Sequence, residues 1–455
     1  MNVIKSKSII CFYIFYLLFF FDQLAFAELL TYKNAIKDSI NSSAGLRVKI
    51  EDVRIANAQY RGSFAELYPS ITINGRTERY ENLDNRNNQI LDTIGNEVVG
   101  GNQTAWKSSL SLSGQYYFSH WYKKRYEVQY YEKMRDVNVH ECESTAKKMI
   151  KDVTDIFGGI TEGKIKLKYG IEILSRLCII ADIKGQAFKL GQYSYEDVLK
   201  AQSDAVSMEK EIVKIRKELK EYLARLGIYT GNSYTEKTDI AYLTPQGWFP
   251  VSDEKKVILS TPEYLARRRE LEAARSREKA AANNFWPDIS LYGRYDLYNA
   301  TSDFNKTYND VRPVGYSAGL LISIPLFDGG VRKWERQRNI HEIRKQEESA
   351  WAAFAEKNKD IKTLQAGLTE LNKTYNHFRK LNQQYEKLTA IAQKAHFLGD
   401  RSNLDIMDLE KDALGVERDF KIAANTLAVY EKQLMLELDY KQFMREHDGD
   451  WSCKY

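Results

Sequence analysis

Few residues in this 455-residue sequence have the types and spacing that catalysis requires. The segment His341-Glu342-Ile343-Arg344-Lys345 begins like a zinc-protease helix but lacks the second histidine that would complete the metal site. No Gly-x-Ser-x-Gly elbow occurs, and the six histidines are scattered singly along the chain. These observations argue against an enzyme and imply neither a metal nor another cofactor.

The more informative chemistry is a pair of carboxylates on one helix face. Asp405 and Asp408 stand three positions apart near the start of a predicted helix, so their side chains project from the same side. In a trimer they would surround one axis with carboxylates, an arrangement that binds multivalent cations through oxygen. The alternative is a solvated acidic face, because further charged residues follow along the same stretch, at Lys411, Asp412, Arg418 and Asp419.

Two proline-free runs predict the long helices that position these acids. All seven prolines lie outside residues 121–244 and 328–455, and a proline inside a helix removes a hydrogen bond and clashes with the preceding turn. Continuous helices over residues 121–188 and 331–395 would each extend roughly 100 Å. The first prediction is weakened by four glycines, which disfavour a helix interior: Gly158, Gly159, Gly163 and Gly170.

A 3-4 spacing of apolar residues predicts a returning coiled-coil helix after each long helix. One seam runs over residues 198–226, and its counterpart over residues 406–434 follows 208 positions later. Leu190-Gly191 and Leu398-Gly399 stand just before these seams, and glycine commonly ends a helix. Each long helix should therefore turn at its Leu-Gly pair and return antiparallel as a hairpin.

The chain is an internal duplication. Pro69 and its neighbours recur at Pro287, 218 positions later, with Pro, Ile, Gly and Arg in register, whereas Gly191 recurs at Gly399 after 208 positions. The first copy should therefore hold about ten extra residues between positions 80 and 106, where Asn, Asp and Gly cluster as in a loop. We divide the chain into a signal peptide (1–27), a first repeat (28–226), a linker (227–261), a second repeat (262–438) and a tail (439–455).

Each copy carries two stretches in which apolar and polar residues alternate, as in strands with one apolar face. The predicted strands cover residues 70–80, 109–118, 288–297 and 314–326. Strands of about ten residues suit a transmembrane β-barrel, but four cannot close one, since about eight is the smallest closed size. Two chains would leave no useful lumen, whereas three would supply twelve strands and an open one. A soluble β-sandwich is the alternative.

The N-terminal residues predict export. Lys5 and Lys7 precede an apolar run over residues 9–21, and Ala25-Phe26-Ala27 has the small residues of a signal-peptidase site. The run is shorter than the roughly 20 residues of a membrane-spanning helix, which disfavours an N-terminal anchor. The mature chain should start at Glu28, and no later segment has the length and apolarity of a spanning helix.

Cysteine and charge content indicate no further site. Cys142, Cys178 and Cys453 remain after export, and their odd number and spacing predict incidental thiols instead of a disulfide framework. The net charge is only +5, and bases alternate with acids along the predicted helices, so nucleic-acid binding is poorly supported.

Taken together, these features resemble the TolC outer-membrane factor family. The resemblance covers most of residues 29–438 and rests on the strand entries at Pro69 and Pro287, the passage Ile324-Pro325-Leu326-Phe327-Asp328-Gly329-Gly330, and the two Leu-Gly turns. It implies an α+β membrane protein, a homotrimer with a twelve-stranded β-barrel in a Gram-negative outer membrane and a twelve-helix barrel in the periplasm. Such a protein is an exit duct for efflux or type I secretion, and the cargo is not indicated.

The resemblance also implies partners and a gate. An inner-membrane transporter and its adaptor would open the periplasmic entrance, with the adaptor touching the tips at Leu190, Gly191, Leu398 and Gly399. The family's constriction carries residues that match Asp405, Asp408, Arg401 and Asp197 here. Two positions depart from the family, where tyrosine and a hydroxyl residue are usual: His396, which could make the gate pH-sensitive, and Glu196. The functional alternative is a periplasmic coiled-coil adaptor or structural protein without a barrel.

Overall fold

The computed structural model describes residues 29–80, 89–91, 97–99, 105–247, 253–283, 285–301, 303–309, 311–448 and 453. The predicted signal peptide and the mature start at Glu28 lie outside the described residues. The chain divides into two compact units. The first comprises Met1–Ile50, His140–Leu265 and Ala352–Lys454, and the second comprises Glu51–Val139 and Ala266–Trp351 together with Tyr455.

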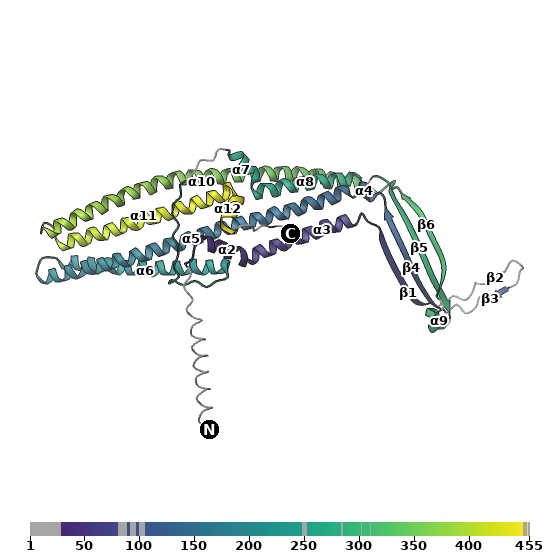
Figure 1. Ribbon diagram of the computed structural model, residues 1–455, viewed down its shortest axis with the longest axis horizontal. Coiled ribbons are helices and arrows are strands. Elements are labelled where there is room, and N and C mark those ends of the chain that lie inside the picture. The colour runs from purple at the N-terminus through teal and green to yellow at the C-terminus, as the bar shows by residue number, and fades with distance from the viewer. Residues whose placement is uncertain are drawn as a thin grey trace, which may run out of the picture. The chain divides into compact units, whose positions relative to one another are not determined.

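The second unit contains a four-stranded antiparallel sheet of β1 (Ser70–Tyr80), β4 (Ala105–Tyr117), β5 (Asp288–Thr301) and β6 (Arg312–Ser323), in the order β1-β4-β5-β6 (Figure 1). All four predicted strands are confirmed. The pairing of β4 with β5 joins a strand of the predicted first repeat to a strand of the predicted second repeat. Within the described residues, β1 and β6 each pair on one side only, so the sheet has two open edges.

One face of this sheet is apolar from edge to edge. Ile73 lies opposite Leu112, Leu112 lies opposite Tyr295, and Tyr295 lies opposite Tyr316, so these side chains share a face. Ile73 is 68% exposed and Tyr316 is 85% exposed. Serines, threonines and charged residues occupy many of the alternate positions, where Tyr292, Tyr298 and Leu321 are exceptions. The alternation predicted from the sequence thus produces an exposed apolar surface that this chain does not cover.

A second, short hairpin follows β1. It consists of β2 (Gln89–Leu91) and β3 (Glu97–Val99), which pair antiparallel. It lies within the segment where the first copy was predicted to hold its extra residues, and the rest of that segment lies outside the described residues.

The remaining elements are helices (Figure 1). The two long ones are α5 (Arg125–Lys189) and α10 (Val331–Phe397), and the two returning ones are α6 (Tyr195–Thr230) and α11 (Asn403–Leu438). The others are α2 (Tyr32–Ser42), α3 (Ala44–Ala65), α4 (His120–Lys123), α7 (Glu254–Ser260), α8 (Pro262–Asn283), α9 (Phe304–Asn309) and α12 (Tyr440–Asp448). Both predicted long helices are confirmed, although the first begins as the separate turn α4, before Lys124.

None of the helices in the described part of the chain is long and apolar enough to cross a membrane.

Helix α5 continues through the four glycines because two of them are contact points. A Cβ on Gly158 would lie 2.5 Å from Val429 of α11, and one on Gly159 would lie 2.7 Å from the ring of Tyr222 of α6. Glycine therefore lets two helices approach α5 more closely than any other residue would. Helix packing outweighs the low helix propensity of glycine at these positions.

The apolar seams close the hairpins. On α6 most predicted seam positions are buried, including Val198, Ile212 and Leu219. Leu427 and Leu434 of α11 pack with Leu368 of α10 in a buried cluster. The seam positions between Ile406 and Leu427 are half-buried within this single chain.

The prediction that the three mature cysteines are incidental thiols is wrong for two of them. Cys142 of α5 and Cys453 form a disulfide, with their Cα atoms 6.0 Å apart. The two residues are 311 positions apart, so no local spacing motif could identify the pair. Cys178 is a free, exposed thiol, which accounts for the odd number.

Candidate gate at the hairpin tips

Each helical hairpin turns at the predicted Leu-Gly pair in a left-handed conformation. Gly191 has a φ of +74° and Gly399 a φ of +85°, a region that other residues rarely adopt. The N–H of Gly191 donates to the carbonyl of Phe188 at 2.9 Å, and the N–H of Gly399 donates to that of His396 at 2.9 Å. These bonds satisfy carbonyls that the helix ends leave free.

The tips expose large apolar side chains. Leu190 is 75% exposed at the first tip, and at the second tip Leu398 is 74% exposed and Phe397 is 91% exposed. Exposure of large apolar side chains to water is unfavourable, so the tips have the composition of a surface that contacts another protein.

The predicted gate aspartates Asp197 and Asp405 serve as helix caps. Ser194 accepts a hydrogen bond from the N–H of Asp197 at 3.1 Å, and Asp197 accepts one from the N–H of Ser194 at 3.1 Å. Ser402 and Asp405 make the same reciprocal pair at 3.2 and 3.3 Å. The hydrogen bonds of Ser194, first from its side chain and then from its backbone, lower the pKa of Asp197. The Ser-x-x-Asp spacing in the sequence could have identified both caps.

The other predicted gate residues of the second tip also have local partners. Asp408 accepts a hydrogen bond from Lys411 at 2.9 Å. Burial alone would lower the pKa of Lys411, but the hydrogen bond and the charge of Asp408 outweigh it and raise that pKa. Nδ1 of His396 lies 2.8 Å from the carbonyl oxygen of Arg401, which ties the two sides of the turn together.

The two tips are not joined to one another. Among the described residues, no hydrogen bond or ion pair links Asp197 or the exposed Glu196 to residues of the second tip. The structure therefore brings Arg401, His396 and Asp405 together around one turn, with Asp408 one turn further along α11. It does not connect them to the first-tip residues within one chain.

The two hairpins instead meet farther from the tips. Nε of Arg176 on α5 lies 3.0 Å from the carboxylate of Glu410 on α11, and the Tyr169 hydroxyl donates to Glu417 at 2.7 Å. Glu410 and Glu417 also line a cleft of about 590 Å³ between α5, α10 and α11. The sequence does not predict these pairs, because their partners lie on different helices with no shared motif. Among the described residues, no group of three or more His, Cys, Asp or Glu side chains is placed to hold a metal ion.

Comparison with known proteins identifies the class to which this fold belongs. Residues 255–436 match the family described as outer membrane efflux protein. No curated protein sequence matches the chain at a significant level.

Three solved structures have a similar fold over nearly the whole chain. CusC has a TM-score of 0.74 at 17% identity, over 90% of this chain and 91% of CusC. The outer membrane protein VceC of Vibrio cholerae has a TM-score of 0.73 at 15% identity, over 90% and 95%. The CmeC outer membrane channel of Campylobacter jejuni has a TM-score of 0.71 at 14% identity, over 93% and 87%. The resemblance to the TolC-like outer-membrane factors is confirmed, because residues 255–436 match the outer membrane efflux family and the chain shares its fold with CusC and VceC.

Proposed function

We propose that this protein is one third of an outer-membrane channel that carries solutes out of a Gram-negative cell. The observation that carries the proposal is the four-stranded sheet, whose apolar face runs from β1 to β6 and is exposed. Lipid is the environment in which such a face is stable, provided that the sheet has no open edge. The match to the outer membrane efflux family supports the same location and a transport role in place of an enzymatic one.

The open edges argue for a trimer. Edge strands β1 and β6 need partners in lipid, and in a closed ring β1 of one chain would pair with β6 of the next. Three chains supply twelve strands, enough for a water-filled lumen, whereas two supply only the smallest closed size. The helical hairpins would then form a twelve-helix barrel in the periplasm.

The hairpin tips would form the periplasmic entrance. In a trimer Asp405 and Asp408 would surround the axis, with Arg401 and His396 beside them and Asp197 and Glu196 on the neighbouring hairpins. The exposed side chains of Leu190 and Leu398, with the glycines Gly191 and Gly399, would contact a periplasmic adaptor that links the channel to an inner-membrane transporter. The description of the matching family favours efflux, with type I secretion as the other role that such a duct could serve.

Light scattering of the detergent-solubilised protein, corrected for bound detergent, tests the assembly and should give three chains per particle. Planar bilayers should show ion conductance. A stable folded monomer that conducts ions would contradict the shared barrel. Recovery of the protein with the periplasm or the inner membrane would instead favour the alternative, a coiled-coil adaptor or structural protein without a barrel.

A further inference from the structure

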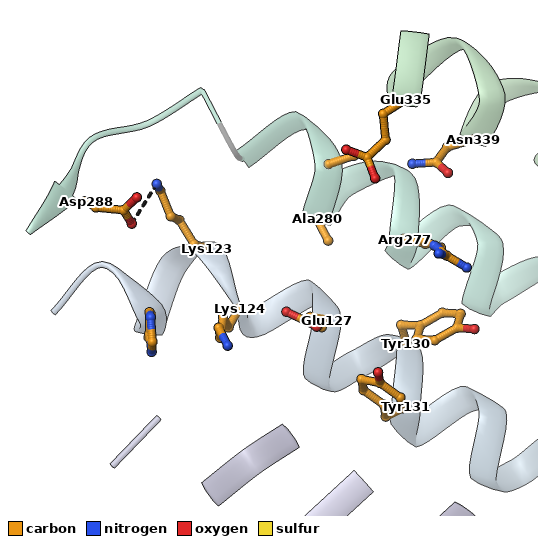
Figure 2. Close-up of a pocket in the computed structure, with 12 residues that line it drawn as sticks. Lys123, Lys124, Glu127, Tyr130, Tyr131, Arg277, Ala280, Asp288, Glu335 and Asn339 are labelled. Atoms are coloured by element: carbon orange, nitrogen blue, oxygen red, sulfur yellow. Dashed lines mark ion pairs between the residues drawn. The ribbon is translucent and has the colours of Figure 1, made fainter. Parts of the chain in front are cut away.

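A polar pocket lies where the first strand pair gives way to helix, within the second compact unit. Its volume is about 450 Å³, within the range of small-ligand sites. Figure 2 shows its walls, which come from α4 and the start of α5, from α8, from α10 and from the first residue of β5. The gate and the barrel do not use this pocket.

The charges that line the pocket are balanced but not all paired. Three basic and three acidic side chains line it: Lys123, Lys124, Arg277, Glu127, Asp288 and Glu335. Lys123 pairs with Asp288 at 2.7 Å (Figure 2), Lys124 pairs with Glu66, and Glu335 pairs with Arg338 at 3.3 Å. In the part of the chain that the structure describes, neither Arg277 nor Glu127 forms an ion pair. One cation and one anion of the lining are therefore outside any ion pair, and the charge of Arg277 acts at longer range on Glu342.

A buried side-chain amide adds a hydrogen-bond donor without an acceptor to the same pocket. Asn339 of α10 is 3% exposed, and its Nδ2 has no hydrogen-bond partner among the described residues. A buried donor without an acceptor costs about 1–3 kcal/mol, so such groups usually face a ligand or a water. Aromatic rings complete the wall, because Arg277 lies 5.5 Å over the ring of Tyr130 and Tyr131 lines the pocket beside it.

Exposed aromatic side chains mark the same junction as a membrane interface. Trp121 is 51% exposed and Trp286 is 60% exposed. The indole N–H of Trp121 donates to the Tyr116 hydroxyl at 2.7 Å, and the rings of Tyr122 and Trp286 pack edge-on with their centroids 6.1 Å apart. Tryptophan and tyrosine gather at the level of lipid headgroups. The pocket thus opens beside a belt of interfacial residues.

We propose that this pocket binds a phosphoethanolamine group, as carried by a zwitterionic phospholipid of the inner leaflet. The phosphate accepts hydrogen bonds from Arg277 and from Nδ2 of Asn339, and the ammonium group donates to Glu127 and lies against the ring of Tyr131. A simple anion would leave Glu127 unpaired, and a simple cation would leave Arg277 unpaired. The lipid source of the group rests on the proposed outer-membrane location.

The test measures binding of short-chain phosphatidylethanolamine to the full-length protein in detergent, with phosphatidylcholine and phosphatidylglycerol as competitors. Phosphatidylcholine has no N–H donor for Glu127 and phosphatidylglycerol has no cation, so each should bind about tenfold more weakly. Free O-phosphoethanolamine tests whether the natural ligand is a lipid or a soluble compound. If it binds the protein more weakly than the lipid does, the ligand is a membrane headgroup, and equal binding indicates a soluble ligand. Equal affinity for all three lipids would overturn the assignment.

Variants locate the site. Arg277→Gln and Glu127→Gln should each weaken binding about tenfold, while Arg275→Gln, an exposed arginine of the same helix that does not line the pocket, should leave it unchanged. Asn339→Leu should also weaken binding, and unchanged binding in Arg277→Gln would place the lipid elsewhere.

Conductance is measured in parallel in bilayers without ethanolamine lipids. If the protein conducts ions but binds all headgroups equally, only the lipid inference is contradicted. If it distinguishes the headgroups but does not conduct ions, only the proposed function is contradicted.

Discussion

The side chains of Cys142 and Cys453 form a disulfide that fastens the C-terminal segment to helix α5. Both residues are almost fully buried, at 0% and 1% exposure. Between them the chain passes through α6, α8, β5, β6, α10, α11 and α12. The bond therefore closes a loop of 311 positions, and long loops are those in which a crosslink most restricts the unfolded chain.

Removing this crosslink should lower thermal stability. We expect Cys142→Ser to reduce the free energy of unfolding by about 2–4 kcal/mol, measured by thermal melts in detergent. Cys178→Ser is the matched control, because this exposed thiol of the same helix has no disulfide partner. The expectation fails if a reductant shifts the melting temperature of Cys142→Ser as much as that of the parent.

A buried charge cluster lies one turn along α5 from the disulfide. Nζ of Lys147 lies 2.6 Å from Glu437 and 3.5 Å from Glu263, and Lys357 lies 3.3 Å from Glu263. Lys147 is 2% exposed. Lys147→Met should cost about 3–5 kcal/mol of unfolding free energy, because two buried carboxylates would then share Lys357 alone. The double variant Lys147→Met with Glu437→Gln should recover part of this loss in the same melts. A double variant less stable than the single one would argue against a charge effect.

The same cluster should make stability depend on pH. Burial by itself would raise the pKa of Glu263, but the charges of Lys147 and Lys357 outweigh it and lower that pKa below its ordinary value of 4.5. A carboxyl with a lowered pKa contributes its full stability above its unfolded pKa and loses it as the pH falls through the folded value. Thermal melts at decreasing pH should therefore show a smaller loss of stability below about pH 4.5 in Lys357→Met than in the parent, because the folded pKa of Glu263 then lies closer to its unfolded value. Identical profiles would contradict the role of Lys357.

Replacement of glycine by alanine should change the free energy of unfolding in opposite directions at two positions of α5. Gly159→Ala should lower the free energy of unfolding by about 1–3 kcal/mol, since the new Cβ would lie 2.7 Å from the ring of Tyr222. Gly185→Ala, where nothing lies within 4 Å, should raise it by up to about 1 kcal/mol through helix propensity. Equal effects at both positions would show that the close approach of α5 and α6 is not required.

The parts of this fold that sequence predicts are those encoded by local periodicity. Alternation around Leu112 and the spacing that begins at Val198 each report which face of an element is apolar, and the structure confirms both. Features that depend on distant pairing leave no local pattern, so in the sequence Cys142 looks like a lone thiol and Gly159 like a possible helix breaker. Lys147 gives no signal at all, because a lysine in a charged helix looks solvent-exposed until its partner Glu437 is placed beside it.

The local arrangement of the candidate gate residues follows only in part from the sequence, and their role in a gate stays a prediction. Asp405 and Asp408 fall on one face of α11 as their spacing requires, but the capping role of Asp405 and the pairing of Asp408 with Lys411 became visible only in the structure. Their placement around a common axis needs neighbouring chains, which neither the spacing nor a single chain supplies.

The gate proposal predicts a cation block that depends on these two carboxylates. With a trivalent cation added from the periplasmic side, single-channel conductance of the parent should fall, because hard cations bind carboxylate oxygens. Asp405→Ala with Asp408→Ala should abolish the block. Arg401→Ser should raise basal conductance by loosening the tip, although the hydrogen bond between His396 and the backbone carbonyl of residue 401 would remain. Because Lys411 holds Asp408 at 2.9 Å, Lys411→Met should free that carboxylate and strengthen the block.

The control variant Ser402→Ala tests whether the block depends on the carboxylates or on the helix cap. It removes the hydroxyl that accepts a hydrogen bond from the N–H of Asp405 and keeps both carboxylates. We expect this control to be blocked like the parent. A double aspartate variant that is still blocked as strongly as the parent would mean that Asp405 and Asp408 do not line the entrance, and loss of the block in Ser402→Ala would assign the effect to the helix cap.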